Sequence, residues 1–404
     1  MKTSDDYLII GAGVIGFSIG ISLLEYNPQF KVRIVEKESI PGAHASGRNS
    51  GVLHAGFYYS PDSLKAKFCK NGNFELKRLA AKHNVSVDNV GKVVVTKNLE
   101  EVERLENLFN RGIENGVDVE LLNAKSLQKY EPLAQSVEKF LWSPTTAIAD
   151  PKSILSAIKA EFLILGGKID FSTKIELVEL GGEIVEKLGQ FDAKYFINAS
   201  GANADLIAKS LGITEEYAMI PFMGQYRTIP LDYLPIRTLV YPVPHPMNPF
   251  LGVHFTLTTD GKVKIGPTAL PILGREQYSA LSGWSMNDIW QTIAGVRSIA
   301  KGNSHSIIEI IKTEFPNLRL SAMVEEAAKL VPSASRQKNW ARRPPGIRAQ
   351  LVHLPTGTLE QDFKIVSHKN SMHVLNAVSP GWTSALPFGR YIVDQIQSKK
   401  KESI

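Results

Sequence analysis

The chain has 404 residues, of which 43% are hydrophobic and 21% are charged, and its formal net charge is +6. These values are ordinary for a globular protein in water and leave room for two domains. Cys69 is the only cysteine, so an intramolecular disulfide is excluded and a reducing compartment such as the cytoplasm fits. Basic residues do not alternate with aromatic ones, so we do not expect a nucleic-acid partner.

The first residues lead directly into an apolar strand, so we expect no signal or transit peptide. No apolar run reaches the ~20 residues that a membrane-spanning helix needs. The basic run Lys399–Lys401 can attract anionic lipid. We therefore expect a cytoplasmic protein, with peripheral contact at the inner face of the membrane as the alternative. No H-E-x-x-H or C-x-x-C pattern occurs, so a metal site is not expected, and we do not expect a serine hydrolase either.

Residues 7–36 predict a nucleotide-binding βαβ unit. An apolar strand over Tyr7–Ile10 is followed by glycines in a G-x-G-x-x-G pattern, a helix to about Tyr26 and a second strand over Lys31–Val35. Glu36 ends the second strand, where its carboxylate can accept hydrogen bonds from a ribose.

Each glycine of this pattern has its own part in binding a pyrophosphate. Gly11 permits a tight turn, Gly13 lets the backbone approach the phosphates, and Gly16 lets the helix pack closely on the sheet. Val14 and Ile15 lie at the helix N-terminus, whose unpaired amides and partial positive charge favour an anion. We therefore expect a dinucleotide at this turn.

The segment after Glu36 favours FAD over a nicotinamide cofactor. Residues 41–51 are small, polar and rich in glycine, without an apolar period, so they predict a loop. Such a loop can line an extended dinucleotide with backbone amides and hydroxyl groups. Six residues of this region are expected to bind FAD: Lys37, Ser46, Arg48, Asn49, Ser50 and Gly51.

Helices and strands alternate in the next part of the chain. Helices are predicted over 99–115 and 154–165, the second with Asp150 at its N-cap and Pro151 at its first position. Strands are predicted over 90–96, 169–171, 175–180 and 194–198. The last of these opens onto a second small-residue turn that we expect to line the dinucleotide: Ala199, Ser200 and Gly201.

The composition and the hydrophobic pattern of the sequence change after residue 218. Residues 219–268 contain β-branched and aromatic residues in short alternating runs, which predict antiparallel strands, and 285–315 predicts helix. Strands over 347–352, 363–366 and 373–377 and a helix over 382–397 complete the chain. The expected fold is α/β, with a Rossmann-type FAD-binding domain and a discontinuous, largely antiparallel substrate domain. The expected boundaries are 1–90, 145–215 and 340–404 for the first domain, and 91–144 and 216–339 for the second.

A series of short runs, spread in order over nearly the whole chain, is similar to runs in one known family. Besides the glycine loop these runs are SGRNSGVLHAGFYY (46–59), SLKAK (63–67), PFMGQY (221–226), YPVP (241–244), PFLGVHFT (249–256), GKVKIGP (261–267), GIRAQ (346–350) and NAVS (376–379). They resemble the L-2-hydroxyglutarate dehydrogenases and oxidases, which are flavoproteins of the D-amino-acid-oxidase-like group. The resemblance implies FAD as cofactor and oxidation of an L-2-hydroxy acid, with L-2-hydroxyglutarate as the leading substrate.

Two stretches depart from the family pattern. Residues 343–348 read RPPGIR where GPAGVR is expected, and 376–384 read NAVSPGWTS where NAPSPAATSS is expected. Trp382 adds bulk beside the expected flavin edge, which affects substrate identity more than chemistry or fold. The resemblance implies flavin contacts from Gly346, Ser379, Gly381, Trp382 and Thr383, the last four at the start of the final helix.

The resemblance also implies two histidines near the flavin. His54 follows the polar loop, and roles as base, flavin-orienting donor, covalent FAD anchor or structural residue stay open. His254 alternates with apolar residues, so on a strand it shares a face with Gly252 and Thr256 and points toward substrate. A neutral imidazole suits the base that takes the hydroxyl proton, and the sequence does not rank the two.

Arg348 is the expected carboxylate clamp, because its planar guanidinium can grip two oxygens at once. A five-carbon diacid needs a second anion-binding group. The candidates for substrate contact are Lys65, Tyr58, Tyr59, Tyr226 and Tyr241.

The leading hypothesis is therefore oxidation of a 2-hydroxy acid to a 2-oxo acid, with electrons passed to a quinone, another carrier or oxygen. The alternatives on the same fold are an amine or amino-acid oxidase and a glycerol-3-phosphate dehydrogenase. A non-catalytic flavin-binding protein is the alternative outside the enzymes.

Overall fold

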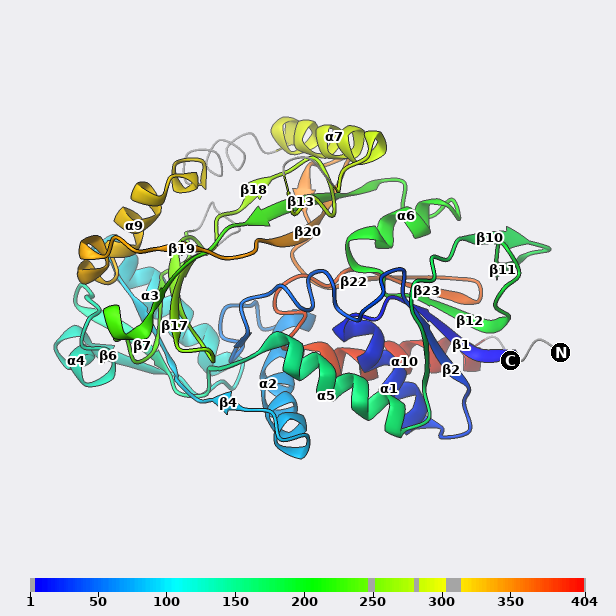
Figure 1. The fold of residues 1–404 in the computed structure, drawn as a ribbon, viewed down its shortest axis with the longest axis horizontal. Coiled ribbons are helices and arrows are strands. Elements are labelled where there is room, and N and C mark those ends of the chain that lie inside the picture. The colour runs from blue at the N-terminus through cyan, green and yellow to red at the C-terminus, as the bar shows by residue number, and fades with distance from the viewer. Residues whose placement is uncertain (1–3, 246–250, 280–282, 303–313, 403–404) are drawn as a thin grey trace.

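The computed structural model describes residues 4–245, 251–279, 283–302 and 314–402 (Figure 1). The amino-terminal strand lies inside a six-stranded sheet whose order is β22 (Lys364–His368), β23 (Ser371–Asn376), β12 (Ala193–Asn198), β1 (Asp5–Ile10), β2 (Val32–Val35) and β9 (Lys168–Asp170). All neighbours are parallel except β22, which runs antiparallel to β23 at one edge. Because the other strands are parallel, the segments that follow β1, β2, β12 and β23 leave the sheet at the same edge.

Helices cover one face of this sheet (Figure 1). They are α1 (Val14–Tyr26), α2 (Leu64–Lys82), α5 (Pro151–Ile164) and α10 (Ala385–Glu402). Helix α1 is buried along most of its length, because it packs between the sheet and both α5 and α10. A Cβ at Gly20 would lie 2.6 Å from the Phe162 ring, and one at Gly389 would lie 2.6 Å from the Ser18 carbonyl oxygen. These two glycines therefore allow the close helix contacts.

A second, eight-stranded sheet forms the other large layer. Its order is β19 (Ala341–Arg342), β14 (Arg227–Pro230), β17 (Lys262–Gly266), β16 (His254–Thr258), β15 (Leu239–Pro242), β5 (Lys92–Val95), β7 (Lys139–Ser143) and β6 (Glu120–Asn123). All of its pairs are antiparallel except β15 with β5, which is parallel. Helices α3 (Glu100–Glu114) and α9 (Leu320–Ala328) contribute to the core beside this sheet.

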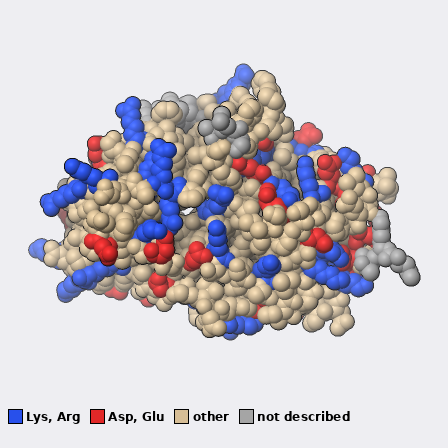
Figure 2. Space-filling model, in the orientation of Figure 1, with Lys and Arg blue, Asp and Glu red and all other residues tan. Residues whose placement is uncertain are grey.

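Three smaller sheets and three further α-helices complete the described fold, apart from five short 3-10 helices. The sheets contain β18 (Leu270–Pro271), β13 (Tyr217–Gly224), β20 (Gly346–His353) and β21 (Thr358–Leu359); β3 (Val52–Leu53), β8 (Ala147–Ala149) and β4 (Val87–Asp88); and β10 (Leu177–Leu180) with β11 (Glu183–Glu186). The helices are α4 (Leu127–Tyr130), α6 (Ala204–Lys209) and α7 (Met286–Gly302). Lys, Arg, Asp and Glu side chains are interspersed on the face shown in Figure 2.

The α/β fold class and the largely antiparallel second sheet are confirmed, and α5 begins as predicted, since Asp150 accepts a hydrogen bond from Ser153 N at 2.8 Å. The predicted start of the last helix is wrong: α10 begins at Ala385, and residues 379–384 form turns. The reason lies in Thr383, whose hydroxyl donates to the Val52 carbonyl at 3.3 Å and accepts from His54 N at 3.2 Å. The turn thus holds the chain against β3 before the helix starts.

Two further expectations need adjustment. Gly252 does not lie on a strand with His254, because β16 begins at His254 and Gly252 has φ +69°. The predicted helical region 285–315 contains α7, and its residues 303–313 lie outside the described residues.

Strand β20, from the last predicted segment of the FAD domain, pairs with β13, and the division into domains stays a prediction. Among the described helices, none combines the length and apolar character needed to cross a bilayer.

Candidate active site

One continuous cavity of about 1460 Å³ extends from the carboxyl edge of the six-stranded sheet to the face of the eight-stranded sheet. Every residue expected to bind cofactor or substrate lines it, except Gly16 and Gly51. Gly16 lies under the first turn of α1, and Gly51 lies beneath the loop, where a Cβ would lie 2.5 Å from the Ala149 carbonyl oxygen. Neither glycine lines the cavity, and each allows close backbone packing behind its wall.

The turn after β1 has no room for side chains. Gly11 has φ +110°, and a Cβ there would lie 2.6 Å from the Ala199 carbonyl oxygen. A Cβ at Gly16 would lie 2.0 Å from the Gly11 carbonyl oxygen. The turn can therefore bring its backbone close to a ligand only with glycine at these positions.

The polar loop 41–51 and Glu36 organise the same turn. Ser46 Oγ accepts a hydrogen bond from Val14 N at 3.0 Å, and the Glu36 carboxylate accepts one from Ala12 N at 2.8 Å. Asn49 braces the loop by donating to the Ser46 carbonyl at 2.9 Å. These contacts hold the start of α1 open to the cavity.

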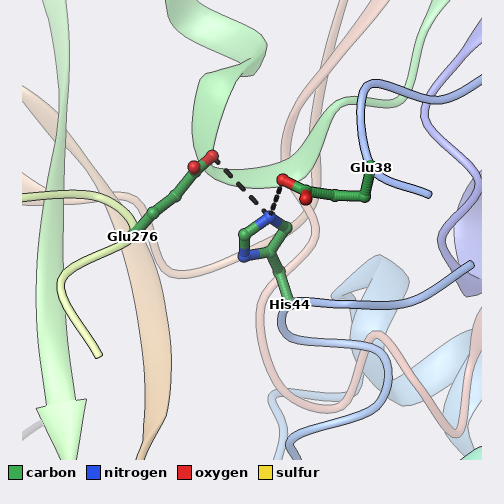
Figure 3. A group of neighbouring side chains, drawn as sticks. All are labelled: Glu38, His44 and Glu276. Atoms are coloured by element: carbon green, nitrogen blue, oxygen red, sulfur yellow. Dashed lines mark hydrogen bonds and ion pairs between the residues drawn. The ribbon is translucent and has the colours of Figure 1, made fainter. Parts of the chain in front are cut away.

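A cluster of charged side chains, called the clasp below, lies at this loop and contains Lys37, Glu38, His44 and Glu276, of which Figure 3 shows the last three. The Lys37 ammonium lies 2.5 Å from Glu38 and 2.8 Å from Glu276, and His44 Nε2 lies 3.0 Å from Glu38. Tyr278 hydrogen-bonds His44 Nδ1 at 3.1 Å. Because a lysine already supplies positive charge between the two carboxylates, the group is explained as an ion-pair clasp rather than a metal site.

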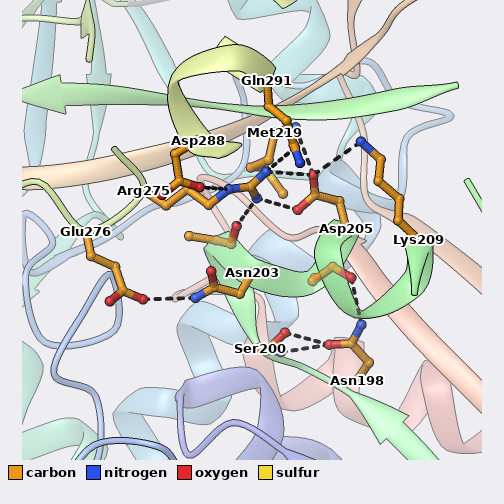
Figure 4. A network of polar contacts seen from close by, with 12 residues as sticks. Asn198, Ser200, Asn203, Asp205, Lys209, Met219, Arg275, Glu276, Asp288 and Gln291 are labelled. Carbon is orange, nitrogen blue, oxygen red and sulfur yellow. Dashed lines mark hydrogen bonds and ion pairs between the residues drawn. The ribbon is translucent and has the colours of Figure 1, made fainter. Parts of the chain in front are cut away.

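A buried ion-pair network anchors the segment that carries Glu276 (Figure 4). Arg275 pairs with Asp205 of α6 and, through Nε, with Asp288 of α7 at 3.0 Å. Asn203, just before α6, donates to Glu276 at 2.9 Å. The network ties the small-residue turn after β12 to the segment that carries Glu276, and residues of both line the cavity.

At the far end of the cavity, one face of the eight-stranded sheet carries polar side chains. The pairing of Val240 with Phe255 brings Tyr241 opposite His254, and their ring centroids are 3.9 Å apart. Lys264 lies 4.9 Å from the Tyr226 ring centroid and donates to the Ser50 carbonyl at 2.9 Å. The sheet thus forms one wall that joins the polar loop.

Burial sets the protonation of both histidines. It lowers the pKa of His254 to about 3, although the hydrogen bond to the Gly252 carbonyl opposes this. It lowers the pKa of His54 well below its ordinary value, with smaller contributions from the positive charge of Lys92, from His254 and from Arg348. Both imidazoles are therefore neutral near pH 7 and able to accept a proton.

His54 is held by its backbone while its ring faces the cavity. Its carbonyl accepts hydrogen bonds from Asn73 Nδ2 at 3.2 Å and from Cys69 Sγ at 3.4 Å. Its Nδ1 has no hydrogen-bond partner within the described part of the chain. Such an orphaned buried nitrogen fits a site that awaits a ligand.

Arg348 enters the cavity from β20, opposite Phe222 of β13. Burial lowers its pKa, while the nearby hydroxyl groups of Tyr59 and Tyr226 oppose the shift. Lys65, from the first turn of α2, lines the same region, and burial followed by the charge of Arg348 lowers its pKa to about 8. These residues can together hold an anion with two charged ends.

These observations fit an extended dinucleotide such as FAD. The glycine turn admits a pyrophosphate, and the polar loop continues the cavity toward the histidines. Trp382 Nε1, like His54 Nδ1, is buried without a partner among the described residues, and it also lines the cavity.

The sequence reading missed several residues that shape the site: Lys92, Asn203, Lys264, Arg275, Glu276 and Tyr278. Lys92 carried one signal, because it is the one charged residue in the predicted strand 90–96. The other five carried none, since their partners are distant in the sequence.

Residues 6–395 match the model of a family described as FAD dependent oxidoreductase. The chain is 35% identical to the L-2-hydroxyglutarate dehydrogenase of Escherichia coli (strain K12), over 97% of this chain and 93% of that protein. It is 30% identical to the mitochondrial L-2-hydroxyglutarate dehydrogenase of Homo sapiens, over 98% of this chain and 89% of that protein.

Two solved structures share the fold. They are a dithionite-reduced L-α-glycerophosphate oxidase from Mycoplasma pneumoniae with FAD bound (TM-score 0.74, 23% identity, 97% of this chain and 94% of that chain) and glycine oxidase from Geobacillus kaustophilus (TM-score 0.71, 18% identity, 98% and 95%).

Proposed function

We propose, from the premise that this chain belongs to the L-2-hydroxyglutarate dehydrogenase family of FAD-dependent oxidoreductases, that it oxidises L-2-hydroxyglutarate to 2-oxoglutarate. One observation carries the proposal beyond the family: His54, His254 and Arg348 reach one cavity from three separate segments of the chain. The pKa of His54 responds to both His254 and Arg348, which supports their proximity. A proton acceptor beside a carboxylate grip is what a 2-hydroxy acid requires.

FAD supplies the hydride acceptor for this reaction. Arg348 holds the C1 carboxylate and so orients the carbon that bears the hydroxyl group. His54 or His254 takes the hydroxyl proton while the hydride leaves the same carbon, so the alcohol loses two electrons and becomes a ketone. Tyr58, Tyr59, Tyr226 and Tyr241 surround the substrate and exclude water.

Lys65 holds the second carboxylate of the five-carbon diacid. It lines the cavity with Arg348 and is itself only 7% exposed, so its charge acts in a site partly shielded from solvent. Burial and the charge of Arg348 lower the pKa of Lys65 to about 8, against the opposing effect of Asp362 and Glu360, so the ammonium is largely charged near pH 7 and can pair with a carboxylate.

Anaerobic addition of substrate to the holoenzyme tests the activity directly. L-2-Hydroxyglutarate should bleach the visible flavin absorbance, whereas D-2-hydroxyglutarate, L-glutamate and glycerol 3-phosphate should leave it unchanged. Bleaching by L-glutamate or another amino acid, with none by the hydroxy acid, would assign the site to amine oxidation instead.

For the electron acceptor we favour a quinone. The protein reaches it by peripheral contact between α7 and an anionic membrane surface that faces the cytoplasm. Exposed apolar residues and two basic residues lie on or beside this helix, next to the cavity mouth: Trp284, Met286, Trp290, Ile293, Arg297 and Lys301. Tryptophan and basic residues together suit the interface of an anionic membrane.

Vesicle sedimentation tests this contact. The holoenzyme should sediment with phosphatidylglycerol vesicles but not phosphatidylcholine vesicles, and Trp290→Ser should abolish the sedimentation with phosphatidylglycerol. Reduction of oxygen without vesicle binding would favour an oxidase in solution.

A further inference from the structure

A short loop, residues 360–362, connects the strand that carries Arg348 with the helix that carries Lys65. It follows β21, which pairs with β20, and it precedes β22 of the six-stranded sheet. Glu360 lines the cavity together with Arg348 and Lys65, whereas Asp362 does not. The loop thus adjoins the two cationic groups of the proposed site, although the reaction described above gives it no role.

Asp362 binds the first turn of α2. Its carboxylate accepts hydrogen bonds from Leu64 N at 2.7 Å and from Lys65 N at 3.1 Å. Amides in the first turn of a helix have no carbonyl partner within the helix, and the helix dipole favours a negative charge there. Asp362 therefore fixes the backbone of Lys65 from a distant part of the chain.

The residue after Asp362 contacts the side chain of the same lysine. Lys65 Nζ lies 5.9 Å from the centroid of the Phe363 ring, a distance at which a ring face still attracts a cation. Phe363 is buried and stacks on Phe388 of α10, with the ring centroids 4.4 Å apart. The backbone and the ammonium group of Lys65 are thus both held by this part of the chain.

The other side of the loop is bound to β20 and β23. Gln350, two residues after Arg348, donates from Nε2 to the Glu360 carbonyl at 2.8 Å. Asn376 donates from Nδ2 to the carbonyls of Glu360 at 3.2 Å and of Asp362 at 2.6 Å. The side chains of Gln350 and Asn376 are buried, so water does not compete for these bonds. A continuous path of hydrogen bonds therefore leads from the strand of Arg348 to the first turn of α2.

The loop also opposes the repulsion between the two cationic groups. The charge of Arg348 acts against the charged form of Lys65, whereas the carboxylates of Asp362 and Glu360 favour that form. Two like charges in a shielded site repel each other and tend to move apart unless other contacts hold them. Asp362 supplies such a contact, because it binds the lysine backbone and carries the opposite charge.

We propose that Asp362 is a positioning residue that fixes the spacing between Lys65 and Arg348 and so sets the length of the dicarboxylate that the site accepts. This inference rests on the proposed function, in which these two cations hold the two carboxylates. A rigid frame binds the diacid that matches its spacing without a further cost of ordering its side chains. A shorter or longer diacid leaves one carboxylate without full contact, because the frame does not adjust to it.

Dicarboxylates without a hydroxyl group test this spacing without turnover. Glutarate has the chain length of the proposed substrate, succinate is one carbon shorter and adipate is one carbon longer. Butyrate is glutarate without its second carboxylate, so it measures the contact with Arg348 alone. Each compound is titrated into the holoenzyme, and Kd is obtained from the change in flavin absorbance or from calorimetry.

The titrations compare wild type with three variants. Asp362→Ala removes both acceptors of the α2 amides, and Asp362→Asn keeps the size and one acceptor but removes the charge. Asp150→Ala is the matched control, because Asp150 caps α5 by accepting from Ser153 N at 2.8 Å and does not line the cavity. Loss of either cap should lower the Tm of the holoenzyme.

In wild type, glutarate should bind roughly tenfold more tightly than succinate, adipate or butyrate. In Asp362→Ala, Kd for glutarate should rise about three- to tenfold, while Kd for adipate and butyrate changes less than about twofold. The preference for one chain length is then largely lost. Asp362→Asn should show a smaller shift in the same direction, and Asp150→Ala should keep the wild-type preference.

A folded, FAD-loaded Asp362→Ala protein with the wild-type preference for glutarate would overturn the proposal. Asp362→Asn replaces this variant if the alanine variant does not fold, and failure of both to fold would assign Asp362 to folding instead.

The proposed function can fail separately. A wild-type holoenzyme that binds glutarate no more tightly than butyrate would exclude the role of Lys65 and this inference with it. If glutarate is preferred but L-2-hydroxyglutarate does not bleach the flavin, only the proposed reaction is wrong. The chain-length preference of Asp362→Ala then still decides whether Asp362 sets the spacing.

Discussion

Nδ1 of His254 lies 2.8 Å from the carbonyl oxygen of Gly252. A carbonyl oxygen can only accept a hydrogen bond, so Nδ1 carries the proton in the neutral imidazole and Nε2 keeps its lone pair. His254 is therefore set up to accept a proton at Nε2, whereas His54 has no comparable contact at Nδ1 among the residues described.

Replacement of His254 by Asn tests this assignment. The Asn amide can donate to Gly252 as Nδ1 does, but it offers no base at the position of Nε2. We expect His254→Asn to fold and bind FAD while kcat falls by roughly 10²–10⁴-fold, the usual contribution of a general base. Single-turnover flavin reduction measures the step. A normal rate in His254→Asn, with a loss of that size in His54→Asn, would transfer the role to His54.

The pH dependence follows from the direction of the pKa shifts. Burial lowers the pKa of both histidines below the ordinary 6.5, so the neutral, basic form persists as the pH falls through that value. The acid limb of kcat/KM should therefore lie below 6.5. Lys65, with its pKa lowered to about 8, loses its charge above that pH, so KM for the diacid should rise on the basic side. An acid limb centred at or above 6.5 would contradict a buried histidine base.

Arg348 should act mainly on substrate binding. Arg348→Ala removes one partner of a buried charge pair, which costs about 2–5 kcal/mol, or roughly 30-fold to several thousand-fold in kcat/KM. Arg348→Lys should recover little, because an ammonium cannot make the two parallel contacts of a guanidinium. Steady-state kinetics and the flavin-to-protein absorbance ratio check the two parts. Loss of bound FAD in either variant would instead make Arg348 a cofactor residue.

The cofactor half of the cavity could be predicted because its determinants are local. Gly11, Gly16 and Glu36 belong to one βαβ unit, and their spacing alone requires a turn that only glycine allows. The fold class, the family and FAD were predicted from the sequence and are confirmed. The roles of the individual site residues stay predictions.

The substrate half depends on contacts between distant segments. Lys92 approaches Tyr241 only because β5 pairs in parallel with β15, and Arg275 meets Asp205 only when α6 and α7 are in place. The predicted start of α10 was wrong for the same reason, since Thr383 contacts His54 and Val52, which lie far from it in the sequence. Sequence spacing carries no information on such pairings.

The clasp at Glu276 should slow the loss of FAD. Glu276 pairs with Lys37 at 2.8 Å and accepts from Asn203 at 2.9 Å, so it links three separate segments that line the cavity. Glu276→Gln removes the charge and weakens the link by about 0.5–1.5 kcal/mol, since the pair is partly exposed, which corresponds to roughly two- to tenfold faster FAD release. Trapping released FAD with an apoflavodoxin measures the rate. Glu179→Gln is the matched control, because Glu179 forms an exposed pair with Lys369 away from the cavity lining. Equal release rates in the two variants would show that the clasp does not retain the cofactor.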